Sequence, residues 1–374
     1  MTDGVYRNSI DTVVIGGGQA GLATSYHLKT ARIDHVVLDE NEEVGASWRN
    51  RWDSLRLFTP AKYSSLPGLD NPAPAHARLG KDDIADYLQD YARRFDLPVT
   101  NGVKVNRLDF EGDRYFVYTS DGPVTANNVV VATGGFGKPR IPAFADKLDE
   151  GILQMHSSEY QRPSQLQDGP VLVVGAGQSG AEIALELVED RAVWISGHDN
   201  GEEPIRPGSK ADRFVTPIMV FMVTKVINVA NPIGRKVRDH FLRPPRGIPR
   251  AGGTRKRINE SEIDWVGRTT GVDKGRPQLD DGRVLDVANV VWCTGFTPGY
   301  DWIDLPIFDE YGYPDHNKGV VEAQPGLYFI GLLFQRSLSS ALIVGVGRDA
   351  RYLVDHIAAH RSTTPREHIP EGSP

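Results

Sequence analysis

The stretch VVIGGGQAGLATSYHL, residues 13–28, contains the pattern that decides the fold of this 374-residue chain. An apolar run ends at Gly16, and the spacing G-x-G-x-x-G follows before an apolar-periodic helix. In this spacing Gly16 permits a tight turn, Gly18 lets the backbone approach a pyrophosphate, and Gly21 allows a helix to pack closely on a strand. The helix N-terminus offers free N–H groups to the anion. The segment therefore predicts a strand–turn–helix unit that binds a dinucleotide.

A second copy of this unit, VLVVGAGQSGAEIALEL, occupies residues 171–187, and the first glycines of the two copies are 159 residues apart. Each copy is followed by an apolar run that ends in Thr-Gly: NNVVVATGGF at 127–136 and ANVVWCTGF at 288–296. Their glycines, Gly134 and Gly295, are 161 residues apart. The repeat predicts an α/β fold with two Rossmann-like dinucleotide-binding domains, the second inserted in the first.

The second Thr-Gly strand returns the chain to the first unit, which sets the expected domain boundaries. We expect an FAD-binding domain from residues 1–165 and 286–374. We expect an NAD(P)H-binding domain at 166–285, with a basic and apolar insertion at about 204–257.

The residue that ends the strand after each glycine turn indicates the preferred nucleotide. Asp39 ends the first such strand, and its carboxylate can accept ribose hydroxyls while disfavouring a 2′-phosphate, which favours FAD or NAD. The corresponding position of the second unit has Ser196, Gly197 and His198. Because no carboxylate stands there to repel a 2′-phosphate, we expect NADPH in preference to NADH. Two nucleotide sites on one chain favour hydride transfer from a nicotinamide to a flavin.

Composition excludes several other classes. The chain is 40% hydrophobic and 24% charged, and its single cysteine, Cys293, cannot form an intrachain disulfide or a cysteine-rich zinc site. This usage fits a reducing cytoplasm. Ten histidines show no metal-ligand spacing, so we predict no metal, and no apolar run reaches the length of a membrane span. The net charge of −7 argues against nucleic acid as a partner.

The charge is concentrated unevenly along the chain. Residues 206–257 contain thirteen Lys and Arg against two Asp, a net charge of +11, which leaves −18 for the rest of a chain whose total is −7. Arg206 or Lys210 in this insertion could serve as the cation for the 2′-phosphate if His198 does not. Three interpretations of the insertion stay open: a basic face covering the NADPH entry, a lid over the substrate channel, or peripheral docking on a membrane surface. A homodimer is a reasonable expectation for such an enzyme.

Several further segments resemble one known family. GASWRNRWDSLRLFTP at 45–60 resembles the G-x-W-R-x-R-(Y/W)-D-x-L-x-L-x-T-P segment of flavin-containing monooxygenase-like proteins, and HSSEY at 156–160 resembles the end of their fingerprint between the two domains. VVWCTGF, PGLYFIGL and GVGRDA resemble their C-terminal half. The resemblance spans nearly the whole chain; it is closest to the bacterial CzcO-type branch and extends to the plant YUCCA monooxygenases.

The resemblance and the glycine motifs together imply two sets of cofactor-binding residues. The FAD set comprises Gly16, Gly18, Gln19, Ala20, Gly21, Asp39, Glu40, Trp48, Arg49, Leu57, Thr59, Val105, Ala132, Thr133, Gly134, Gly295, Gly331 and Gln335. Within it, the resemblance puts Val105 near the adenine, Trp48 and Arg49 on the flavin side, Gly331 at the ribityl end and Gln335 at the isoalloxazine edge. The NADPH set comprises Gly175, Gly177, Gln178, Ser179, Gly180, Ser196, Gly197 and His198.

The family resemblance also implies a reaction. NADPH would reduce FAD, and the reduced flavin would react with dioxygen to give a C4a-(hydro)peroxyflavin that oxygenates a small lipophilic substrate. Thr59 and Gln335 would lie near the flavin, and His156 would align the linker between the domains. Tyr160, where the Baeyer–Villiger type has tryptophan, favours N- or S-oxygenation. Two alternatives stay open: an NADPH-dependent flavoprotein reductase or electron-transfer enzyme, and a non-catalytic flavin-binding assembly or sensor protein.

Overall fold

A computed structural model of the chain describes residues 9–135, 137–203, 206–242 and 250–361. Some of the segments predicted above extend beyond this part. The two ends of the expected FAD domain, Phe136 at the close of the first Thr-Gly run, and residues 204–205 and 243–249 of the insertion lie outside the described residues.

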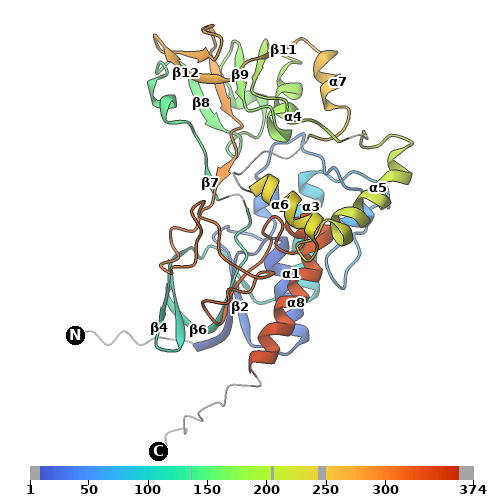
Figure 1. Cartoon of the computed structure of the whole chain (residues 1–374), viewed down its shortest axis with the longest axis vertical. Coiled ribbons are helices and arrows are strands. Elements are labelled where there is room, and N and C mark those ends of the chain that lie inside the picture. Colours follow the sequence, from blue (N-terminus) through green and yellow to red (C-terminus); the bar gives the residue numbers. More distant parts are fainter. Residues whose placement is uncertain (1–8, 136, 204–205, 243–249, 362–374) are drawn as a thin grey trace, which may run out of the picture.

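The first glycine turn belongs to a seven-stranded mixed sheet at the centre of the lower lobe (Figure 1). Strand β1 pairs in parallel with β2 and β6, and β6 also pairs in parallel with β16, which comes from the C-terminal part of the chain. Both chain ends therefore build this sheet, in the order β3-β2-β1-β6-β5-β4. Its strands are β1 Ser9–Ile15, β2 His35–Leu38, β3 Val99–Thr100, β4 Val105–Glu111, β5 Arg114–Thr119, β6 Gly122–Val131 and β16 Leu327–Phe329.

Helices cover one face of this sheet and bury its apolar side chains. The long C-terminal helix α8 packs beside α1 and places Val346, Ala350 and Leu353 in the same core as Val14 and Leu22 (Figure 1). A second core lies on the other face, under the antiparallel strands β4 and β5. The helices of this lobe are α1 Gln19–Thr30, α2 Ala46–Arg49, α3 Lys81–Arg94 and α8 Ile343–Arg361, with short 3₁₀ helices η1 Ala61–Tyr63 and η5 Leu338–Ala341.

The second glycine turn belongs to a five-stranded sheet, all parallel, in the upper lobe, with order β11-β10-β9-β14-β8. Strands β8 and β14 lie outside the expected segment 166–285, so this sheet takes strands from both sides of it. The fold class, α/β with two Rossmann-like units, is confirmed. The elements of this lobe are η2 Ala143–Lys147, β8 Leu153–His156, η3 Pro163–Gln165, β9 Val171–Val174, α4 Gln178–Leu187, β10 Val193–Ser196, β11 Ile263–Val266, β12 Thr269–Asp273, β13 Arg276–Leu279 and β14 Asn289–Trp292.

Two chain segments cross between the lobes and pair with each other. Strand β7 (Lys138–Pro139) on the outgoing segment is antiparallel to β15 (Phe296–Thr297) on the returning one. Glycines allow the two backbones to touch: a Cβ on Gly137 would lie 2.3 Å from the nitrogen of Gly299. The connection is therefore a two-stranded ribbon rather than two independent linkers.

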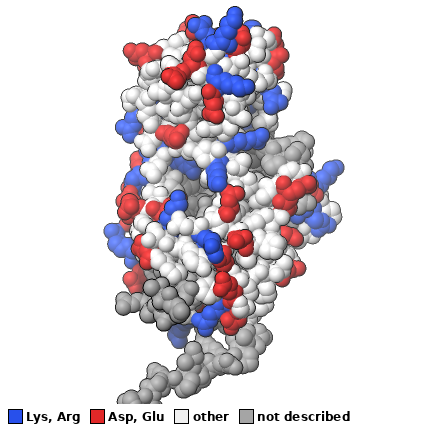
Figure 2. Space-filling model, turned by 90° about the vertical axis from the view of Figure 1, so that its left-hand side faces the viewer, with Lys and Arg blue, Asp and Glu red and all other residues white. Residues whose placement is uncertain are grey.

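The basic insertion forms helices that flank the lower lobe (Figure 1). These are α5 Asp212–Phe221, the π-helix η4 Met222–Val226 and α6 Pro232–Leu242. The chain then returns to the upper lobe, where α7 Thr254–Asn259 packs beside α4 (Figure 1). Within the described residues, no helix combines the length and the apolar character that crossing a membrane requires. On the face shown in Figure 2, acidic and basic side chains are interspersed over both lobes.

Replacement of Gly21 tests whether close packing of α1 on the turn is needed for folding. A Cβ at this position would lie 1.8 Å from the carbonyl oxygen of Gly16, which is fixed backbone. We expect Gly21→Ala to lower the free energy of unfolding by about 1–3 kcal/mol, the usual cost of an overpacked site. Urea unfolding followed by circular dichroism measures this, with Gly151→Ala as the control, because Gly151 has open space around it and, like Gly21, no positive φ.

Candidate functional site

The first glycine turn leaves free space in front of the N-terminus of α1. Gly16 has a φ of +108°, and a Cβ there would lie 2.6 Å from the carbonyl oxygen of Ala132. Gly18 precedes the helix in extended conformation, and nothing lies within 4 Å of the position of its Cβ. The turn is thus tight where strand and helix meet and open where a phosphate group would approach the helix N–H groups.

Asp39 lies directly beside this turn, at the end of β2. Its buried carboxylate accepts the N–H of Gly17 on Oδ2 at 2.5 Å, and the backbone and side-chain nitrogens of Asn41 on Oδ1 at 2.8 and 2.7 Å. These bonds use three of the four lone-pair positions of the carboxylate, so one is available to a ribose hydroxyl. Asn41 was not predicted, although it stands only two residues after Asp39. Glu40 faces Lys104 at 3.8 Å instead.

The residues predicted around the adenine and ribityl ends come from distant parts of the chain. Val103, rather than Val105, donates its N–H to the carbonyl of Asp39 at 2.9 Å and is buried, whereas Val105 pairs with Thr119 in the sheet. Gly331, with a φ of +81°, lies against the start of α1, since a Cβ there would be 3.2 Å from that of Ala20. The C-terminal strand thus reaches the first glycine turn.

Trp48 and Arg49, on the short helix α2, point to different partners. The indole N–H of Trp48 donates to Gln19 at 3.1 Å, which ties α2 to the first turn of α1. The guanidinium of Arg49 bonds instead to carboxylates at the surface, including Asp86 and Glu43 at 2.9 Å. The hydrogen bond that Arg49 donates to Asp86 is the main cause that raises the pKa of Arg49. This placement departs from the expectation that Arg49 faces the flavin.

The remaining members of the first set lie at the carboxyl end of the sheet or in the loop after α2. Ala132 and Leu57 are buried, and Ala132 continues the β1–β6 pairing through a 2.8 Å hydrogen bond to the carbonyl of Ile15. Thr133 is exposed, and Gly134 follows it with a φ of +78° and open space around it.

Two predicted catalytic groups, Thr59 and Gln335, form hydrogen bonds within the chain. The hydroxyl of Thr59 lies 3.4 Å from that of Ser64. The amide of Gln335 is almost fully buried, donates to the carbonyl of Lys318 at 3.2 Å and accepts the N–H of Leu332 at 3.4 Å. Both side chains are thus held in place by their surroundings, as residues that shape a pocket would be.

His156 joins the end of β8 to the segment that returns between the lobes. It is fully buried, its Nε2 lies 3.0 Å from the carbonyl oxygen of Gly295, and its Nδ1 lies 2.8 Å from the hydroxyl of Ser158. The ring also makes an edge contact with Phe296 at 4.9 Å. Burial lowers the pKa of this histidine, so the neutral ring is favoured. The role of His156 in aligning the linker stays a prediction.

The second glycine turn repeats the geometry of the first. Gly175 has a φ of +115°, and a Cβ there would lie 2.2 Å from the carbonyl oxygen of Cys293. A Cβ on Gly180 would lie 1.8 Å from the carbonyl oxygen of Gly175, the same value as in the first turn, while Gly177 faces open space. Gln178 begins the helix and accepts the N–H of Ala251 at 2.7 Å. Ser179 follows it, partly exposed.

Of Ser196, Gly197 and His198, only His198 is exposed. Arg206 and Lys210, the alternative cations for the 2′-phosphate, are also exposed. Ser196 is almost fully buried; its hydroxyl donates to the carbonyl of Gly267 and accepts the N–H of Thr269, both at 2.8 Å. This departs from the expectation that Ser196 contacts the phosphate. Gly197, with a φ of +142°, accepts the indole N–H of Trp265 at 2.9 Å.

Two arginines beside the second turn were missed by sequence reasoning. Arg250 is fully buried, donates to the carbonyl of Ala176 at 2.9 Å and to Asp199 at 2.5 Å, and has its guanidinium 5.0 Å from the ring of Trp265. Arg255 forms a second ion pair with Asp199. The bond from Arg250 outweighs burial and lowers the pKa of Asp199. Two guanidinium groups against one carboxylate leave positive charge beside the second glycine turn.

An ion pair between Arg78 and Asp212 attaches the insertion to the lower lobe. Both side chains are mostly buried, and Asp212 also accepts hydrogen bonds from the N–H of Gly208 and the hydroxyl of Thr216. Burial alone would raise the pKa of Asp212, but these bonds together hold it below the ordinary value. A cavity of about 80 Å³ opens beside the pair; it is lined by Pro60, Lys62, His76, Gly208, Ser209, Asp212, Arg213 and Thr216.

Comparisons with known proteins place this architecture in a family. Residues 13–227 match the model of the pyridine nucleotide-disulphide oxidoreductase family. The chain is 42% identical to an uncharacterized CzcO-like oxidoreductase of Geobacillus kaustophilus, over 95% of this chain and all of the relative. It is 27% identical to a probable indole-3-pyruvate monooxygenase of the YUCCA type from Arabidopsis thaliana, over 94% of this chain and 98% of the relative.

A solved structure shows the same similarity. The flavin-containing monooxygenase of Stenotrophomonas maltophilia superposes with a TM-score of 0.76 and 26% identity, over 95% of this chain and 99% of that one.

The lowered pKa of Asp212 predicts a pH-dependent attachment of the insertion. The ionised carboxylate of Asp212 stabilises the folded state fully above the ordinary carboxyl pKa of 3.8, and this stabilisation is lost as the pH falls through the lowered pKa. At neutral pH we expect Asp212→Asn to lower the free energy of unfolding by about 1.5–3 kcal/mol, because Arg78 loses a charged partner. Urea unfolding as a function of pH checks this. The difference from the wild type should shrink at acidic pH, whereas Asp34→Asn, at an exposed position, should cost little throughout.

Gly18→Ala separates folding from dinucleotide binding at the first turn. Its Cβ would point into open space, so the free energy of unfolding should fall by less than about 1 kcal/mol, the cost of a poorer helix N-cap. The same Cβ would occupy the approach to the helix N–H groups, so the affinity for FAD should fall by at least about tenfold. Fluorescence titration of apoprotein with FAD measures the affinity, and unchanged binding would contradict the assignment.

Proposed function

The chain belongs to the flavin monooxygenase-like proteins of the pyridine nucleotide-disulphide oxidoreductase family, and on this basis we propose that it is an FAD-dependent monooxygenase that uses NADPH. We propose a small lipophilic substrate, with N- or S-oxygenation favoured over Baeyer–Villiger chemistry. The observation that supports this most strongly is the pair of glycine turns, one on each sheet, in which the last glycine approaches the carbonyl oxygen of the first equally closely. The paired ribbon of β7 and β15 connects the two lobes, and His156 bonds to Gly295 next to it.

The first turn fits the pyrophosphate and ribose of FAD. Gly18 leaves the approach to the N-terminus of α1 open, and Asp39 keeps one acceptor position for a ribose hydroxyl beside it. Gly331 brings the C-terminal strand within contact of Ala20, so both ends of the chain would hold the cofactor. When bound, FAD supplies the redox centre that takes reducing equivalents from NADPH and transfers oxygen to the substrate.

The second turn is suited to NADPH because positively charged side chains lie beside it. Gly177 leaves the helix N-terminus of α4 open to a pyrophosphate, and Arg250 and Arg255 provide the positive charge for the 2′-phosphate that Ser196 cannot provide. Asp199 holds both guanidinium groups in position. Because the guanidinium of Arg255 is exposed, it is the group that would contact phosphate oxygens, while the buried Arg250 adds positive charge behind it. This arrangement favours NADPH over NADH.

The side chains of this protein would contribute to the reaction by binding and orienting the cofactors and the substrate and by excluding water. The neutral His156 fixes the ribbon between the lobes and so holds the two turns at a constant separation. The buried amide of Gln335 and the hydroxyl of Thr59 have defined partners, so they can form pocket walls that do not admit water in place of substrate. The insertion, fixed through Arg78 and Asp212 beside Pro60, would cover this region as a lid.

We further propose a cytoplasmic location, because a single cysteine fits a reducing compartment. A homodimer and a peripheral membrane contact of the insertion are also proposals. The apolar side chains of Phe214, Ile218 and Phe221 on α5 are exposed. Their exposure favours a contact of α5 with either a second copy of the chain or a membrane surface.

Oxygen reactivity tests the proposed activity directly. The FAD-loaded protein is reduced anaerobically with NADPH or NADH and then mixed with oxygenated buffer while the absorbance spectrum is recorded. A transient spectrum that lasts longer in the presence of NADP⁺ would support a monooxygenase. Direct return of the oxidised spectrum with stoichiometric hydrogen peroxide would favour the reductase alternative, and no reduction by either nucleotide would refute both enzyme assignments.

Arg255→Ala tests the proposed NADPH selectivity. The side chain of Arg255 is more than half exposed and forms an ion pair with Asp199, so its removal should leave the fold intact. We expect KM for NADPH to rise by about tenfold, because one charge-assisted contact to the phosphate is lost, while KM for NADH stays unchanged. The neighbouring Lys256→Ala, whose ammonium pairs with Glu260 on the same helix, is the matched control. Equal effects on both nucleotides would contradict the assignment.

A further inference from the structure

A separate cavity lies where the insertion contacts the C-terminal part of the chain. Its volume is about 260 Å³, which is large enough for a small organic molecule. The cavity contains none of the residues predicted for either nucleotide. Its lining comes from both sides of the contact: Thr224, Lys225, Asn228, Val229 and Ala230 of the insertion, and Lys318, Arg336 and Arg348 of the C-terminal part.

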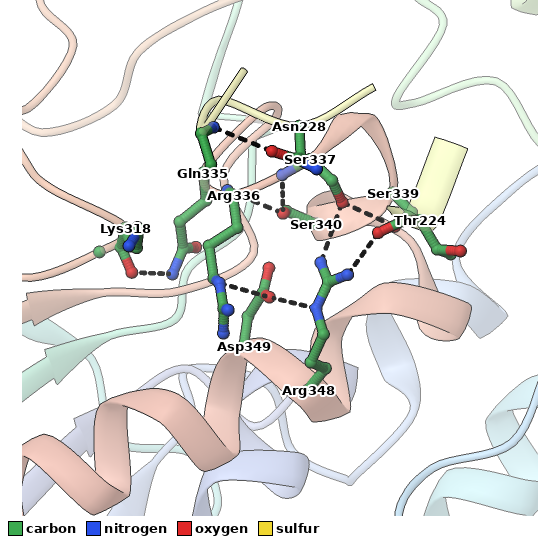
Figure 3. A network of polar contacts seen from close by, with 12 residues as sticks. Thr224, Asn228, Lys318, Gln335, Arg336, Ser337, Ser339, Ser340, Arg348 and Asp349 are labelled. Carbon is green, nitrogen blue, oxygen red and sulfur yellow. Dashed lines mark hydrogen bonds and ion pairs between the residues drawn. The ribbon is translucent and has the colours of Figure 1, made fainter. Parts of the chain in front are cut away.

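The backbone of the insertion is fixed against the segment that follows Gln335. The N–H of Val229 donates to the carbonyl of Arg336 at 2.8 Å, and the N–H of Leu338 donates to the carbonyl of Ile227 at 3.1 Å. Arg348 on α8 reaches across to the carbonyl of Thr224 at 2.5 Å (Figure 3). The walls of the cavity are therefore defined by hydrogen bonds from both sides.

The cavity carries a surplus of positive charge. Four of its lining residues are cations, and the carboxylate that faces them is Asp349, which is fully buried behind the wall between Arg336 and Arg348 (Figure 3). Its Oδ1 lies 3.1 Å from Nε of Arg348 and 3.8 Å from Nε of Arg336. Lys225 and Lys318 form no ion pair with any described residue. One carboxylate against four cations leaves a local charge of about +3.

Three of the four cations, Lys318, Arg336 and Arg348, are held in place before any ligand arrives. The guanidinium of Arg336 lies over the ring of Tyr352 at 4.7 Å, and the ammonium of Lys318 lies over the same ring at 5.8 Å. Arg348 is fixed by its bonds to Thr224, Asp349 and the hydroxyl of Ser337, the last at 2.9 Å. Because these side chains have already lost rotamer freedom, ordering them on anion binding would cost little conformational entropy.

We propose that this cavity binds a small organic anion whose carboxylate or phosphate group contacts Lys225 and Lys318, with the rest of the molecule against Val229 and Ala230. Guanidinium and ammonium groups recognise both kinds of anion, and the two aliphatic side chains favour an apolar body. The bound anion joins the insertion to the C-terminal part. Occupancy therefore strengthens the attachment of the insertion, whatever reaction the two nucleotide turns support.

Isothermal titration of the full-length protein, in low-salt buffer without nicotinamide nucleotide, tests this site. The probes are phenylacetate, inorganic phosphate and the neutral analogue phenylacetamide. We expect phenylacetate or phosphate to bind, phenylacetamide not to bind, and the affinity to fall as salt is added. Binding of phenylacetate alone identifies a carboxylate ligand, and binding of phosphate alone identifies a phosphate ligand. Absence of binding by both anions, or equal binding of the amide, would overturn the proposal.

Variants locate the binding in this cavity. Lys225→Gln and Lys318→Gln together should weaken anion binding by at least about tenfold, and Lys225→Gln alone should weaken it by less. Lys236→Gln, at an exposed position on α6 outside the cavity, should leave the affinity unchanged. Since Lys225 is exposed, its single variant keeps the test valid if the double variant does not fold. Unchanged affinity in the folded variants would also overturn the proposal.

Discussion

Close contact between a helix and the turn before it is the constraint on which the rest of this structure depends. In each unit the last glycine of the motif stands against the carbonyl oxygen of the first, so that no side chain fits between Gly21 and Gly16 or between Gly180 and Gly175. This contact aims the helix N-terminus at the space in front of Gly18 and Gly177. Asp39 lies beside the first opening, and Arg250 lies beside the second.

Ordered connections keep the two openings in a fixed relation. The ribbon of β7 and β15 and the buried ring of His156 link the lobes, while Arg78 and Asp212 attach the insertion to the lower lobe. The insertion is attached a second time by Arg348 and its neighbours on α8. Ion pairs at such sites fix the relative positions of segments more than they raise the net free energy of unfolding. The reason is that the desolvation free energy of the two charges is about as large as their mutual attraction.

The parts of the site predicted from the sequence are those that local chain geometry controls. The glycine turns and Asp39 follow one another along single strand–turn–helix units, so spacing alone indicates their places. Arg49 and Ser196 behaved otherwise: each stands next to a correctly predicted element, yet its side chain bonds to groups far away in sequence, Asp86 and Gly267. Arg250 was missed because its contact with Ala176 spans 74 residues and has no local signal.

Sequence patterns were sufficient for the fold class, the two glycine turns and the affiliation with flavin monooxygenase-like proteins. Strand–turn–helix units are specified by short-range apolar patterns and by glycines at positions where a Cβ would meet backbone atoms. The tertiary structure decided which charges meet: Asp199 with two arginines, Asp212 with Arg78, and four cations around one cavity. Long flexible side chains find partners across distant segments, and only the folded packing of those segments determines which partners are within reach.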